Sequence, residues 1–264
     1  MRRVAIPFLL GAISGALGGL MGVGGGIVLV PLLVHVLDHR QHEAQGISLA
    51  FIIVTSLVAA ASYYRHASVD VVLAGWLTLG AVPGVIAGSR LAAASPAGRL
   101  RVAFGIVVLL TGIRLLASPP RLPVATGAAA WAPPFECALG LVVGVFAGLL
   151  GVGGGTILVP ILVLAQGIDQ HTAQGTSLLM IIPVGLVGVW SYAKHRRLES
   201  EGLPWLLLGG AGGALAGSIL AHRIQGPTLT RLFALFMLAV GIQMIFGRPR
   251  GTVPRSEATL GEIQ

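Results

Sequence analysis

The chain contains two identical blocks of glycine whose backbone could bind an anion. One block spans Gly22–Gly26, the other spans Gly151–Gly155, and both read Gly-Val-Gly-Gly-Gly. Glycine permits turns with positive φ and lets another group come close to the backbone. Each block precedes an apolar segment, so the free N–H groups and positive dipole end of a following helix would face the loop. Because this arrangement suits an anion, we predict a substrate site formed by Gly22, Gly24, Gly25, Gly26, Gly151, Gly153, Gly154, Gly155 and Thr156.

A second set of candidates consists of neutral hydrogen-bond donors that follow each glycine block. The stretch Ala44–Leu49 has a counterpart in Ala173–Leu178, at the same offset of 129 residues that relates the glycine blocks. We expect these donors at the starts of the third apolar segments, where they could bind an oxyanion without holding it as a fixed cation would. Helix capping is the structural alternative for the hydroxyl side chains. The donors of this set are Gln45, Ser48, Gln174, Thr176 and Ser177.

The composition around these candidates is that of an integral membrane protein. The 264 residues are 55% hydrophobic and 10% charged, and the mean hydropathy is +0.90. Soluble domains carry about 25% charged residues, so the deficit indicates membrane segments rather than a large soluble core. The net charge is +8, but the basic residues lie in short loops between apolar runs. We therefore expect the lipid bilayer, and no nucleic acid, as the partner of this charge.

The offset of 129 residues divides the chain into two homologous halves. We predict a first transmembrane repeat at 1–117, a Pro/Ala-rich linker at 118–134, a second repeat at 135–246 and a polar C-terminal tail at 247–264. The predicted fold is all-α, with five apolar segments per half. These segments are expected at 4–22, 26–37, 45–64, 71–93 and 102–117, and at 135–151, 155–166, 174–193, 203–221 and 229–246.

Five segments per half is an odd number, so the second half would enter the membrane with the opposite orientation. With a cytoplasmic N-terminus and ten crossings, twelve Lys and Arg residues fall on the cytoplasmic side and five on the far side, as the positive-inside tendency requires. Counting the first two segments of each half as one crossing changes the split to eleven and six. We predict inverted repeats, with eight crossings as the alternative to ten.

The second segment of each half is short for a membrane span. Residues 26–37 would form about 18 Å of helix, against roughly 30 Å of hydrocarbon. Short, glycine-interrupted segments at matching positions of two halves are typical of transporters built from repeats with broken helices. Broken backbone at membrane depth must be buried in protein or line a polar cavity. The pattern therefore predicts broken helices that face a binding site.

These paired motifs resemble those of the TauE/SafE family of sulfite and anion exporters. The resemblance is carried by Gly22–Pro31 with Ala44–Leu49, and by Gly151–Pro160 with Ala173–Leu178, and it extends over residues 4–246. It implies a multi-pass permease of the bacterial inner (plasma) membrane that moves sulfite, sulfoacetate or related anions. The chain departs from the pattern at Ile47, where the second copy has the more typical threonine.

Two other classes of membrane protein explain parts of the sequence. A divalent-metal transporter would use histidines, but of His35, His39 and His42 only the last has a counterpart, His171, in the second half. An intramembrane enzyme would need a set of catalytic residues within the membrane. No carboxylate falls in the middle of a segment, and a serine without an adjacent base is not an activated nucleophile. We predict no enzymatic activity, no metal and no cofactor.

Further glycines recur at four-residue spacing and predict close helix packing, within the chain or between copies in a homo-oligomer. They are Gly11, Gly15, Gly19, Gly84, Gly88, Gly209, Gly213 and Gly217.

The resulting hypothesis is a secondary transporter or facilitator that exports small inorganic or organic oxyanions. No Asp, Glu or Lys lies mid-segment, whereas proton-coupled carriers usually hold an ionisable group within the membrane. We therefore expect export to run on the membrane potential and the anion gradient. If transport is proton-coupled instead, His42 and His171 are the first candidates for the proton carrier.

Overall fold

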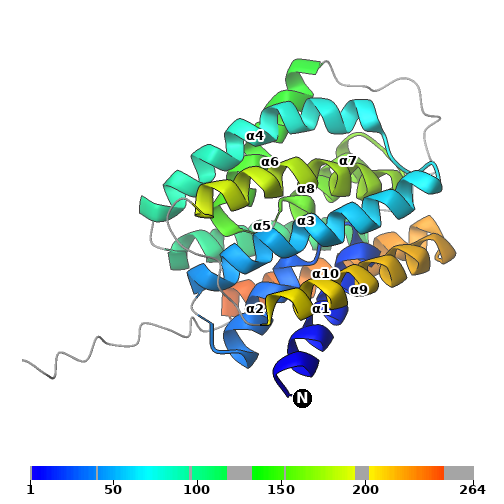
Figure 1. Ribbon diagram of the computed structural model, residues 1–264. Helices are drawn as coiled ribbons and strands as arrows, with labels where there is room; N and C mark the ends of the chain where they lie inside the picture. The colour runs from blue at the N-terminus through cyan, green and yellow to red at the C-terminus, as the bar shows by residue number, and fades with distance from the viewer. Residues whose placement is uncertain are drawn as a thin grey trace, which may run out of the picture.

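The protein is a bundle of α-helices (Figure 1), seen in a computed structural model that describes residues 2–39, 41–94, 97–117, 133–151, 153–193 and 202–246. Each predicted segment corresponds to one helix, which confirms the all-α class. The linker residues 118–132 and the tail 247–264 lie outside the described residues. The helices are α1 Arg2–Met21, α2 Gly26–Val36, α3 Gln41–Arg65, α4 Val71–Ala94, α5 Ala97–Ala117, α6 Pro133–Leu150, α7 Gly155–Ala165, α8 Gln170–Ala193, α9 Leu203–Arg223 and α10 Gly226–Phe246.

The outer surface of the bundle is apolar, and several helices are long enough to span a bilayer. Within the described residues, seven helices have at least 18 residues and suitable hydropathy, namely α1, α3, α4, α6, α8, α9 and α10. Leu79 and Trp190 are 62% and 60% exposed, respectively, although both are large apolar side chains. Such side chains face lipid at no cost, and the chain is a multi-pass membrane protein. The second helix of each half is short, as predicted: α2 and α7 have 11 residues each.

Glycine allows two pairs of helices to touch backbone to backbone. On α9, a Cβ atom at Gly213 would clash with the carbonyl oxygen of Ala12 on α1, and on α6 a Cβ at Gly144 would clash with that of Ala81 on α4. This confirms that the glycines at four-residue spacing serve close packing. They serve it inside the chain, so these faces are not available to a second copy.

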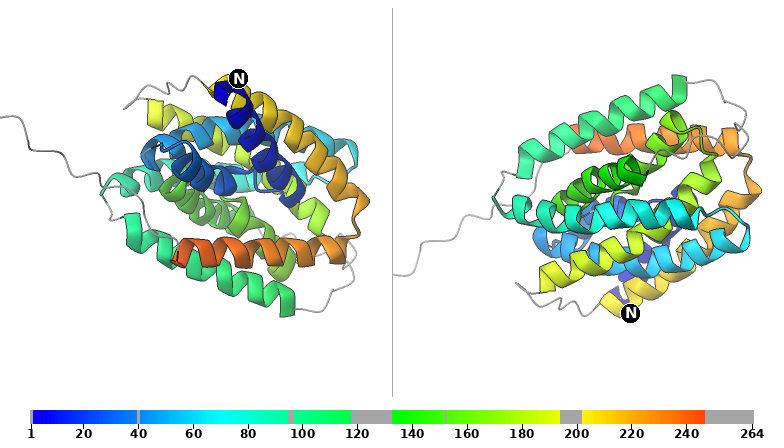
Figure 2. Two further views of the ribbon diagram at one scale, coloured as in Figure 1. Left: turned by 90° about the horizontal axis from the view of Figure 1, so that it is seen from below. Right: turned by 90° about the horizontal axis from the view of Figure 1, so that it is seen from above.

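The helix pairs are equivalent in the two halves. The contact of α1 with α9 corresponds to that of α6 with α4, and the counterparts α3 and α8 pack directly on one another, as do α5 and α10 at one edge of the bundle (Figure 2). Gly188 lies against Leu49 and Gly185 against Ile53, so α3 and α8 run antiparallel. Inverted halves would produce this arrangement, and their orientation in the bilayer stays a prediction.

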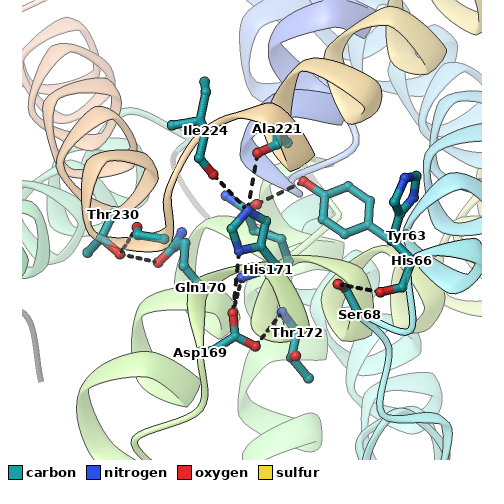
Figure 3. A network of polar contacts seen from close by, with 12 residues as sticks. Tyr63, His66, Ser68, Asp169, Gln170, His171, Thr172, Ala221, Ile224 and Thr230 are labelled. Carbon is teal, nitrogen blue, oxygen red and sulfur yellow. Dashed lines mark hydrogen bonds and ion pairs between the residues drawn. The ribbon is translucent and has the colours of Figure 1, made fainter. Parts of the chain in front are cut away.

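One end of the bundle brings together four helix ends. Tyr63 near the end of α3 lies beside residues at the start of α8 and the end of α9, and Thr230 at the start of α10 donates to Gln170 at the start of α8 (Figure 3). A path that reverses direction at each of ten segments places all four ends on one side of the membrane. With one crossing for α1–α2 and for α6–α7, the end of α3 and the start of α8 would lie on opposite sides. The packing therefore favours the ten-segment path.

Adjacent glycines on α9 provide a test of the backbone contact. We expect Gly213→Ala to lower the melting temperature in detergent, because its methyl group would collide with the α1 backbone. Gly212→Ala is the matched control: no atom lies within 4 Å of a Cβ there, and alanine favours a helix over glycine by about 1 kcal/mol. Equal melting temperatures for the two variants would contradict the packing.

Candidate functional site

The helix breaks occur at the two glycine blocks, as predicted, and their backbones match. Gly22, Gly24 and Gly25 have φ of 71°, 73° and 82°, and their counterparts in the second half have 68°, 85° and 81°. Side chains with a Cβ rarely adopt such values. At the first break, the Val23 N–H donates to the Gly18 carbonyl at 3.1 Å and closes the end of α1 with the bond typical of a glycine-terminated helix.

The two breaks lie against each other in the centre of the protein. A Cβ at Gly155 would be 3.0 Å from the carbonyl oxygen of Gly22, and one at Gly26 would be 3.7 Å from that of Gly151. The counterparts Ile52 and Ile181 close over both loops. All described residues of the two breaks are buried. The glycine blocks therefore form one contact between the halves that is buried from solvent.

The helices that leave this contact bring positive potential to it. The first amides of α2 and α7 to find a backbone acceptor are those of Val28 and Ile157, which bond to the carbonyls of Gly25 and Gly154 at 3.2 and 3.1 Å. The preceding amides of each helix have no acceptor among the described residues. Each helix start carries the equivalent of roughly +0.5 charge. Two such ends at one buried contact favour an anion between them.

Four of the five predicted polar side chains lie at the glycine loops. Gln174 packs against Gly22 and Gln45 against Gly151. The Ser48 hydroxyl donates to the Gly151 carbonyl at 3.4 Å, and the Ser177 hydroxyl lies beside Gly155 without a hydrogen-bond partner. The first half therefore contributes Gln45 and Ser48 to the loop of the second half. The second half contributes Gln174 to the loop of the first half and Ser177 to its own loop.

The predicted helix starts at Gln45 and Gln174 are wrong. The third helix of each half begins one turn earlier, at Gln41 and Gln170, and the carboxylate of Asp169 caps α8 by accepting from the N–H groups of His171 and Thr172 at 2.9 and 3.1 Å. The backbone amides near the glutamines therefore belong to the helix interior. Only the side chains of these residues can reach a ligand.

Thr176 lies away from the loops. Its hydroxyl accepts a hydrogen bond from the N–H of Asp70 at 3.0 Å, and next to it Gly175 gives room to the carbonyl of Ser68. Both residues hold the turn between α3 and α4 against α8. They have a structural role, although the repeat placed them in the same motif as Ser177.

Several polar residues at the loops were not predicted. The hydroxyl of Thr55 donates to the Gly24 carbonyl at 2.7 Å, and the Ser56 hydroxyl lies beside Gly24 without a partner. The Tyr63 hydroxyl donates to Oε1 of Gln174 at 2.8 Å. These residues could have been predicted from their helical spacing from Ser48 along α3. The comparison of the two halves does not identify them, because the counterparts of Thr55 and Ser56 are valine and glycine.

Among the described residues, no three His, Cys, Asp or Glu side chains are arranged to hold a metal ion. The side chain of His42 lies outside the described residues. The rings of His66 and His222 are stacked with centroids 4.0 Å apart, so their nitrogens do not converge on one point.

An apolar multi-pass bundle with two broken helices that meet at a buried, positive contact is a membrane transporter. The chain belongs to the family described as "Sulfite exporter TauE/SafE", which it matches over residues 7–258. It is 30% identical over 251 residues to a "Probable membrane transporter protein" of Xylella fastidiosa, covering 89% of this chain and 92% of the relative. It is 27% identical over 270 residues to "Probable membrane transporter protein YunE" of Bacillus subtilis, covering 91% and 97%. No solved structure matches the chain.

Neighbouring residues on α3 test whether the partnerless hydroxyls serve the fold. We expect Ser56→Ala to leave the melting temperature of the substrate-free protein unchanged or higher, because a buried hydroxyl without a partner costs about 1–3 kcal/mol. Thr55→Val is the matched comparison and should lower it, since the Gly24 carbonyl would lose its donor. A melting temperature that falls equally in both variants would mean that Ser56 has a partner in the fold.

Proposed function

We propose that the protein exports small oxyanions, with sulfite or a sulfonate as the substrate, across the bacterial inner membrane. The observation that carries the proposal is the buried contact between the starts of α2 and α7. It offers backbone amides, dipole ends and neutral side-chain donors to one ligand. No Lys or Arg side chain lies at the two glycine loops among the described contacts.

Several donors at the loops lack acceptors among the described residues. Four buried side-chain atoms on or against the loops have no hydrogen-bond partner among the described residues. They are Oγ of Ser56 and Ser177, Oγ1 of Thr156 and Nε2 of Gln174. Each such group costs about 1–3 kcal/mol when left unpaired. A tetrahedral or pyramidal oxyanion offers several acceptor oxygens at once and would remove this cost.

Tyr63 fixes the orientation in which Gln174 can act. Its hydroxyl lies 2.8 Å from Oε1 of Gln174 and 3.2 Å from the Gly19 carbonyl oxygen. Donation of its single proton to the nearer Oε1 leaves the amide nitrogen for a ligand. Gln174 in turn packs directly against Gly22. The side chain is therefore held as a donor beside the first glycine loop, which favours an anion over a cation as the ligand.

Neutral donors also suit a transport cycle. A carrier must release its substrate as well as bind it, and a fixed ammonium or guanidinium in a buried site would hold an anion strongly. Glycine loops provide donors and, at the same time, chain segments with wide conformational freedom. Because the site is closed to solvent, the halves must separate on each side in turn to admit and release the anion.

The same donors test the proposal by flux measurements with purified protein in vesicles. We expect Ser177→Ala to raise the KM for sulfite by about tenfold or more, the value of one hydrogen bond to a charged group. Gly212→Ala, which changes a lipid-facing position away from the site, should leave KM and maximum flux unchanged. Sulfite, a sulfonate and sulfate are compared to define the substrate. Unchanged kinetics in Ser177→Ala and Ser56→Ala would remove these hydroxyls from the site.

The driving force can be tested separately. No Asp, Glu or Lys lies mid-helix among the described residues, and an anion that leaves a negative interior gains about 2.3 kcal/mol per charge per 100 mV. With equal pH on both sides, we expect flux to follow the potential that potassium and valinomycin impose. Flux that ignores this potential but follows a pH gradient would show obligatory proton coupling.

A further inference from the structure

Three histidines cluster at the end of the bundle where α3, α8 and α9 meet. The ring of His222 on α9 is stacked on that of His66, in the turn directly after α3, with centroids 4.0 Å apart, and lies 5.5 Å from that of His171 on α8. The ring of Tyr63 meets His222 edge to face at 4.5 Å. Figure 3 shows Tyr63, His66 and His171 around this point, with Asp169 beyond. The site proposed above does not use the imidazoles.

The contacts of His171 identify it as the charged member. Its Nε2 lies 3.1 and 3.2 Å from the carbonyl oxygens of Ala221 and Ile224, and its Nδ1 lies 3.4 Å from the carboxylate of Asp169. Both ring nitrogens face acceptors, and only an imidazolium can donate from both. Burial raises the pKa of Asp169, but hydrogen bonds from the side chain of His171, from Thr172 and from the backbone outweigh this and lower it to about 2. The carboxylate is therefore ionised beside the imidazolium.

His222 is the neutral member, because its Nδ1 donates to the carbonyl oxygen of Ser218 at 2.8 Å and its other ring nitrogen faces no acceptor among the described residues. Nδ1 of His66 makes the same contact with the carbonyl oxygen of Ser62, at 2.8 Å. Nε2 of His222 is buried and has no partner among the described residues. It therefore holds a lone pair that can accept a proton. His66 is exposed and connects the cluster to water.

A proton on His222 would destabilise this packing. The titratable groups that face it are Tyr63 on α3, His66 directly after α3, Asp169 directly before α8 and His171 on α8. On α9, Arg223 follows it, and the α10 residue in the network is the uncharged Thr230. The carboxylate of Asp169 already balances His171. A second imidazolium would therefore be repelled by the first, and Asp169 is the one carboxylate that acts on His222 among the described residues.

We propose that His66, His171 and His222 form a proton-binding site that gates the transporter, so that a proton on His222 separates α9 from α3 and α8 and opens this end of the bundle. The gate lies near the substrate loops: Tyr63, which His222 contacts, donates to Gln174, which packs against Gly22. The proposal rests on the proposed function for its effect on flux, but the opening itself is independent of the substrate.

The gate belongs to one end only. The counterpart of His222 in the first half is Ala93, and that of Asp169 is Arg40. The equivalent position at the other end of the bundle therefore lacks both the proton acceptor and the carboxylate. On the ten-segment path, positive charges predict that the end with the cluster faces away from the cytoplasm. Acid outside would then open the outer side and leave the inner side unaffected.

Flux at equal pH on both sides, with the potential clamped, tests the gate. Histidine titrates between about pH 5 and 8, so wild-type flux should rise at least about threefold from pH 7.5 to pH 5.5. His222→Asn keeps an N–H donor but takes up no proton, and should hold flux at its high-pH level. His35→Asn is the matched control, because His35 also contacts the carbonyl four residues earlier, at 2.8 Å, but is exposed on α2. It should keep the wild-type pH response.

Thiol labelling reads the opening without transport. In a Cys137→Ala background, Ala221→Cys places a thiol at a fully buried position beside His171, and Gln225→Cys provides an exposed reference for the change in thiol reactivity with pH. Labelling at position 221 relative to 225 should rise in acid, and adding His222→Asn should abolish the rise. The gate is wrong if flux through His222→Asn rises in acid as much as flux through His35→Asn, and if labelling at position 221 still rises in acid when His222→Asn is present. If labelling responds to pH while no oxyanion moves at any pH, the gate stands and the proposed function fails.

Discussion

The structure depends on the need to satisfy backbone polar groups where no water is present. A helix broken inside a membrane exposes amides and carbonyls that lipid cannot bond. The protein has two such breaks and buries each against the other, between α3 and α8. This requires helices of one half to reach into the other. The glycine contacts of α1 with α9 and of α4 with α6 allow the two halves to interlock closely enough to exclude lipid from the breaks.

The sequence predicted the features that depend on local backbone or on the repeat. The glycine blocks predicted the breaks because positive φ is a local property, and the offset of 129 residues predicted the helix pairs. It could not predict the hydroxyls of Thr55 and Ser56, because they are not repeated and only tertiary packing brings them to the loops. The start of α8 was misplaced because Asp169, which caps it, has no acidic counterpart in the first half.

The two halves have nearly the same backbone arrangement but different polar side chains. The loops have matching backbones, so each helix start contributes equally to the potential at the centre. The side chains around them differ: the first loop is lined by Thr55 and Ser56, whose counterparts are Val184 and Gly185. At one end of the bundle three imidazoles cluster around His222, whose counterpart in the first half is Ala93. A symmetric frame lets the protein open to either side, and unequal side chains let the two directions respond to different conditions.

The pairing of α1 with α9 also bears on how the protein is made. Ala12 and Gly213 touch through their backbones, yet 201 positions separate them in the chain. At the usual rate of synthesis this interval lasts roughly 10–40 s. During that time, α1 is already in the membrane with its glycine-lined side uncovered. Its proper neighbour does not yet exist, so during biogenesis this surface must be occupied by lipid or by the insertion machinery, and α9 must displace that occupant late in assembly.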